Sequence, residues 1–176
     1  MCIRDRLLTV FSCMNQTKTS LTQHPLDQSE SRTLVLENGL KVYLLSDPKF
    51  NMSAASMAVE VGSLENPQDR EGIAHFLEHM LFLGTEKFPD VDEYSEYLRT
   101  YGGYANAYTA SDHTNYQLQV LPDGFEGAID RFAQFFIAPL FTDEYTEREV
   151  NAVNSEHQKN IMSENWIQFR VTRLFA

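Results

Sequence analysis

The chain has 176 residues, of which 43% are hydrophobic and 22% charged, and its formal net charge is −11. This length fits one domain, and the apolar fraction supplies a sizeable core and argues against intrinsic disorder. So acidic a chain lacks the cationic surface that binds nucleic acids or anionic membranes. No apolar run approaches the roughly 20 residues of a transmembrane helix. The two cysteines, Cys2 and Cys13, cannot build a disulfide framework.

The first segment, residues 1–31, differs in composition from the rest of the chain. A short basic and apolar stretch precedes Cys13, and residues 14–31 are rich in Ser, Thr, Gln and Asn. We interpret this segment as the remnant of an export signal followed by a disordered linker. It predicts a periplasmic or otherwise exported protein, lipid-anchored through Cys13, with a cytoplasmic location as the alternative.

Residues 32–176 carry the patterns of an α+β domain, in which an antiparallel or mixed sheet packs against several helices in two layers. The expected strands are a hairpin over 33–45 that turns at Asn38-Gly39, then 53–61, 104–110 and 114–121. The expected helices are 72–83 ending at Gly84, 90–101 ending at Gly102-Gly103, one capped by Asp123 with Glu126 and ending before Pro139, and one from about Thr142 past Glu156.

The C-terminal segment predicts that the domain is incomplete. Residues 166–175 are apolar with helical spacing, yet the chain stops at Ala176 without a cap or a polar tail. Domains rarely end inside such a segment, so we expect a C-terminally truncated domain.

The strongest chemical signal is the run His75-Phe-Leu-Glu-His79 in the first predicted helix. The two histidines are four residues apart, so they lie on one face, about 5–6 Å apart at Cβ, and can bind one metal ion. Glu78 shares this arc and can reach a metal-bound water, as in the inverted zincin motif. The alternative is an ordinary surface patch. However, the apolar flanks predict a largely buried helix, whose polar side chains need a partner such as a metal ion.

A catalytic zinc site takes a third protein ligand and keeps one position open for water. The long helix expected after residue 142 offers Glu149 and Glu156 on one stripe, with Ala152 and Val153 between them. We expect this face to be core-like, so that a carboxylate on it is paired or bound to metal. Spacing alone does not choose between the two glutamates.

Three segments, in the same order, resemble the pitrilysin/insulinase family of metallopeptidases. They are His75–Pro89 around the motif, Gly103–Tyr116, and Arg148–Asn160. The resemblance covers residues 32–176. It implies that His75, His79 and Glu156 bind one zinc ion per domain and that Glu78 is the general base.

The resemblance also implies roles around this centre. Glu149 would orient a histidine ligand, and Asn106, Ala107 and Tyr108 would bind the peptide at a sheet edge formed by residues 104–110. The family encloses its substrate with a homologous second half of the protein or a partner subunit. We therefore expect this chain to bind zinc and to be weakly active or inactive alone.

These observations predict a zinc-dependent endopeptidase that hydrolyses oligopeptides or small proteins through a metal-activated water. The main alternative is a non-catalytic homologous subunit of a peptidase complex, which the filled motif positions disfavour. An unrelated metalloenzyme with the same inverted motif is disfavoured by the segment Arg148–Asn160. A structural domain with a chance His-Glu-His patch is the third alternative.

Overall fold

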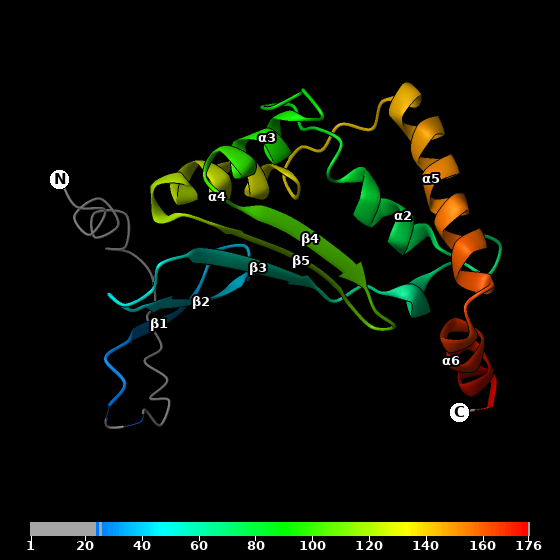
Figure 1. Ribbon diagram of the computed structural model, residues 1–176, viewed down its shortest axis with the longest axis horizontal. Coiled ribbons are helices and arrows are strands. Elements are labelled where there is room, and N and C mark those ends of the chain that lie inside the picture. Colours follow the sequence, from blue (N-terminus) through cyan, green and yellow to red (C-terminus); the bar gives the residue numbers. More distant parts are fainter. Residues whose placement is uncertain (1–23, 25, 176) are drawn as a thin grey trace. The chain divides into compact units, whose positions relative to one another are not determined.

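The computed structural model describes residue 24 and residues 26–175 (Figure 1). The chain divides into two compact units, one up to Asn51 and one from Met52 onward, which are described separately. The predicted export signal with Cys13, and most of the linker, lie outside the described residues. Within the described part, no helix combines the length and apolarity needed to cross a membrane.

The first unit contains a two-stranded antiparallel hairpin. β1 (Glu30–Val35) pairs along its length with β2 (Lys41–Ser46). Gly39 reverses the chain: its φ is 87°, a left-handed value that glycine adopts without strain, and its amide donates to the Leu36 carbonyl oxygen at 2.9 Å. The hairpin predicted to turn at Asn38-Gly39 is confirmed.

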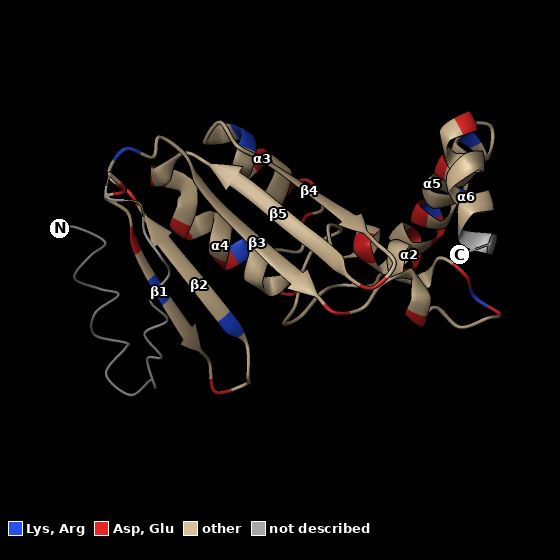
Figure 2. Cartoon of the chain, turned by 90° about the horizontal axis from the view of Figure 1, so that it is seen from below, with Lys and Arg blue, Asp and Glu red and all other residues tan. Residues whose placement is uncertain are grey.

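The second unit is built on a three-stranded antiparallel sheet in the order β3-β5-β4, which Figure 2 shows face-on. The strands are β3 (Ser53–Val59), β4 (Tyr104–Thr109) and β5 (Thr114–Val120). Every second residue of the central strand β5 is buried, which marks the face that the helices cover. Among the described residues β4 pairs only with β5, so the backbone groups along its other edge have no strand partner.

Three helices pack against this sheet: α2 (Ile73–Met80), α3 (Glu93–Thr100) and α4 (Phe125–Gln134). Together with the sheet they enclose one core, which consists of Leu81, Tyr94, Leu98, Tyr116, Leu118, Val120, Ala128, Phe132 and Phe135. The predicted α+β fold, with an antiparallel sheet against several helices, is confirmed.

Arg131 of α4 fixes this helix to its neighbour α3. Its guanidinium group pairs with the Glu93 carboxylate and lies 4.4 Å from the ring centroid of Phe88 and 3.8 Å from that of Tyr97. An Arg–carboxylate pair that also stacks on aromatic rings is held in one geometry. It therefore defines the spacing of the two helices at the solvent side of the core.

The last two helices are α5 (Asp143–Ile161) and α6 (Glu164–Phe175). α5 lies beside α2 (Figure 1), and no residue of α5 is buried. The expected core-like face is therefore wrong: Ala152 is exposed and Val153 is half-buried. The reason is that α5 packs chiefly against α2 and α6.

Two local expectations are also wrong. The Asp123–Glu126 capping pair does not form, because a 3₁₀ turn over Pro122–Gly124 leads directly into α4. α2 is less buried than its apolar flanks suggest, since Ile73 and Leu77 are 43% and 45% exposed. Only one side of α2 packs on the sheet, so these apolar side chains border solvent.

Replacing Leu98 by alanine should lower the free energy of unfolding by about 2–5 kcal/mol, because it leaves a cavity in a well-packed core. Leu98 is 1% exposed, whereas Leu64, in the same unit, is 68% exposed. The matched variant Leu64→Ala should change the free energy by no more than about 0.5 kcal/mol. Denaturant unfolding of the three chains measures both effects. Equal losses in the two variants would contradict the core described here.

Candidate metal centre

α2 presents the three side chains of the motif, and its start is held by an upstream residue. Asn66 lies before the helix, and its Oδ1 accepts a hydrogen bond from the amide of Ala74 at 3.0 Å. This bond satisfies one of the free amides in the first helical turn. The helix is thereby anchored one residue before His75.

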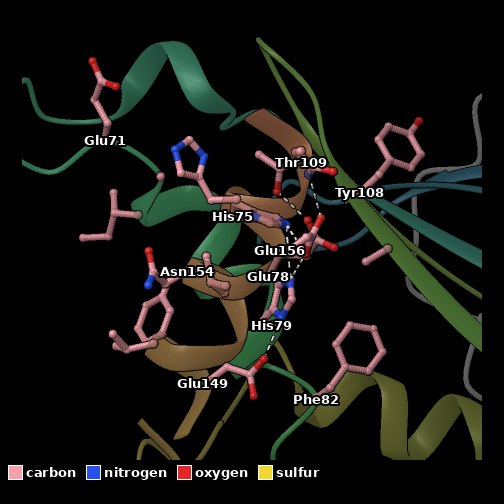
Figure 3. A pocket seen from close by; sticks show the side chains of 18 of the residues that line it. Glu71, His75, Glu78, His79, Phe82, Tyr108, Thr109, Glu149, Asn154 and Glu156 are labelled. Atoms are coloured by element: carbon pink, nitrogen blue, oxygen red, sulfur yellow. Dashed lines mark hydrogen bonds and ion pairs between the residues drawn. The ribbon is translucent and has the colours of Figure 1, made fainter. Parts of the chain in front are cut away.

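The structure brings His75, His79 and Glu156 together, with one ligand atom of each within 4.8 Å of the others (Figure 3). The two Nε2 atoms are 3.1 Å apart, and Oε2 of Glu156 lies 3.8 Å from that of His75 and 3.6 Å from that of His79. Ligands at 2.0–2.1 Å from a tetrahedral zinc ion are separated by roughly 3.3 Å. The three donor atoms therefore fit around one such ion with little adjustment.

Glu149 contacts the other ring nitrogen of His79, Nδ1. Its Oε1 lies 2.7 Å from Nδ1 of His79, and the Glu149 side chain is only 14% exposed. A carboxylate acting as acceptor here takes the hydrogen bond from Nδ1–H, and in that tautomer of His79 the Nε2 lone pair is free to point at the centre. The contact is the one expected of a residue that orients a histidine ligand.

Glu78 lies on the inner side of α2 and is not one of the three converging donors. It is 7% exposed, and its Oε2 accepts a hydrogen bond from Oγ1 of Thr109 at 2.6 Å (Figure 3). A buried carboxylate without a hydrogen bond would be costly, and Thr109 supplies one. Thr109 is a residue of the site that was not predicted from the sequence. One sequence feature could have indicated it: Thr109 is a polar residue at the end of β4, on the same face of the strand as the small residues Ala105 and Ala107.

An open groove of about 1280 Å³ passes the converging side chains. α2, β4, α5 and α6 line it, and the three predicted peptide-binding residues of β4 lie along it. Asn106 and Tyr108 are exposed, and Ala107 is half-buried. The groove thus runs along β4, beside the three converging side chains.

The family model described as Insulinase (Peptidase family M16) matches residues 41–174. Insulin-degrading enzyme of Homo sapiens is 49% identical over 153 residues, which are 87% of this chain and 15% of that protein. The Drosophila melanogaster enzyme is 55% identical over 150 residues, or 85% of this chain and 15% of that protein.

A solved structure agrees with these relatives. The crystal structure of pitrilysin superposes with a TM-score of 0.77 at 40% sequence identity, and the match covers 81% of this chain and 15% of that one. The chain therefore spans about 15% of the length of these relatives.

We expect Glu149→Gln to weaken zinc binding about 10- to 100-fold, because the amide no longer holds His79 in the required tautomer. Competition with a fluorescent zinc chelator measures the dissociation constant. Glu147→Gln is the matched control, since Glu147 is exposed on the same helix. The assigned contact would be wrong if both variants bound zinc equally well.

Proposed function

The chain belongs to the insulinase family, peptidase family M16, and from this premise we propose that it forms the zinc-binding part of an endopeptidase that hydrolyses oligopeptides or small proteins. The observation that carries the proposal is the convergence of His75, His79 and Glu156 from two helices, with Glu78 beside them. Membership of the family supports a peptidase, and the donor set supports its dependence on zinc.

Two histidines and one carboxylate form a ligand set used by catalytic zinc, which leaves a fourth position for water or substrate. Bound there, zinc would supply Lewis acidity toward a peptide carbonyl and a water that loses its proton near neutral pH. In this proposal His75, His79 and Glu156 hold the ion, and Glu149 keeps His79 in the correct tautomer.

Glu78 would act as the general base. It precedes His79 directly in the chain, so its carboxylate stays close to the centre without serving as one of the three ligands. It would accept the proton of the attacking water and pass it to the departing amine. This chemistry needs no serine or cysteine nucleophile.

Peptide substrates would bind in extended form along the free edge of β4. Strand addition reads mainly the backbone of the peptide, and the groove beside β4 leaves space for it. Asn106, Ala107 and Tyr108 are the residues of β4 that would contact the peptide. Because they lie next to Thr109, the bound backbone would pass close to Glu78.

Replacing Glu78 by glutamine should reduce peptide cleavage by about 10²- to 10⁴-fold while zinc remains bound, because the amide cannot accept a proton. A quenched fluorescent peptide and metal analysis measure the two properties. Glu96→Gln, on the exposed face of α3, should change neither. Cleavage that survives in Glu78→Gln would exclude this residue as the base. The unaltered chain should also be joined to the remaining sequence of a relative. If that protein binds zinc fully but cleaves no peptide, the non-catalytic subunit is supported instead.

We further propose that efficient turnover requires a homologous second half or a partner subunit. The chain alone should bind one zinc ion and cleave peptides about 10²-fold more slowly than the same chain joined to the remaining sequence of a relative. A loss of this size is typical when one group that stabilises the transition state is missing. Initial rates of peptide cleavage by the two proteins test this, and equal rates would contradict it.

A further inference from the structure

Thr109 is the residue of β4 whose side chain reaches the metal centre. Its hydroxyl donates to Oε2 of Glu78 at 2.6 Å, and Figure 3 shows the two side chains directed at one another. Among the described residues no other group donates a hydrogen bond to this carboxylate. We propose that Thr109 is a positioning residue that holds Glu78 in the conformation needed for proton transfer; the inference rests on the function proposed above.

The position of the Thr109 hydroxyl is determined by the sheet. Thr109 lies opposite Thr114 in the β4–β5 ladder, and the hydroxyl of Thr114 donates to the Val61 carbonyl oxygen at 2.8 Å. The hairpin closes just beyond, where the amide of Ala110 donates to the carbonyl oxygen of His113 at 2.8 Å. Thr109 therefore stands on a backbone held by its pairing with β5 and by the closing of the hairpin, and its β-branched side chain has few rotamers.

A glutamate needs such an anchor because its side chain has three rotatable bonds. The hydroxyl engages Oε2 only, and no described residue donates to Oε1. A hydrogen bond to an ionised acceptor is stronger than one between neutral groups. Thr109 thus fixes one oxygen of Glu78 and leaves the other available to accept a proton.

The hydrogen bond between Thr109 and Glu78 would also set the position of the base relative to the bound peptide. Thr109 belongs to the strand along which the peptide would bind, and Glu78 belongs to the helix that carries the two histidines. Their hydrogen bond joins β4 to α2 at this point. The distance between the bound peptide and the base would therefore be defined by one side-chain contact.

The test compares Thr109→Val and Thr109→Ala, which lack the hydroxyl, with Thr109→Ser, which retains it. NMR side-chain couplings of Glu78, measured on the zinc-loaded chain, should show one rotamer in the unaltered and Ser chains and averaging in the Val and Ala chains. The zinc dissociation constant should stay the same in all four. In peptide cleavage, kcat should fall about tenfold in the Val and Ala chains with KM unchanged, and by no more than about twofold in the Ser chain.

A single Glu78 rotamer in both hydroxyl-free chains would overturn the inference, as would a Ser chain that behaves like them. The rotamer measurement does not depend on turnover. Absence of cleavage even by the unaltered chain joined to the remaining sequence of a relative would therefore reject the proposed function, while the rotamers still decide the role of Thr109.

Discussion

α5 meets α2 through polar contacts, and none of the residues of α5 is fully buried. The hydrogen bond between Glu149 and His79 is the shortest of these contacts, and Glu156 approaches both histidines from the next turns of the same face. A shift of α5 by one helical turn, about 5.4 Å, would withdraw both carboxylates together. The convergence of the three donor side chains therefore depends on how α5 packs beside α2.

The charges around the centre explain why it suits a divalent cation better than a chance surface patch would. Glu78, Glu149 and Glu156 surround two imidazoles, so three carboxylates lie close together at the junction of two helices. Burial, together with the nearby charge of Glu78, raises the pKa of Tyr116 to about 12. This phenol therefore stays neutral and adds no further negative charge. A cation at the centre would offset the mutual repulsion of the carboxylates.

The order and type of the elements could be predicted from the sequence because periodicity and glycine positions are local signals. The burial of individual side chains could not be predicted in this way, because it depends on which elements pack against them in the folded chain. Ile73 and Leu77 have the spacing of core residues but border solvent. Glu149 and Glu156 share one stripe, so spacing alone did not separate them. The structure does so by the atoms they meet, Nδ1 for Glu149 and Nε2 for Glu156. Thr109 was missed since its partner lies 31 residues away in the sequence.

The open edge of β4 also restricts what could be cut, provided that substrates pair with it as proposed. A polypeptide can line up there only if several consecutive residues have released their own backbone partners. Well-ordered globular regions would be passed over, because local unfolding in them is rare. Loose tails, mobile loops and short unstructured peptides meet the requirement at little cost. The choice of substrate would then depend more on the backbone flexibility of the target polypeptide than on the identity of its side chains.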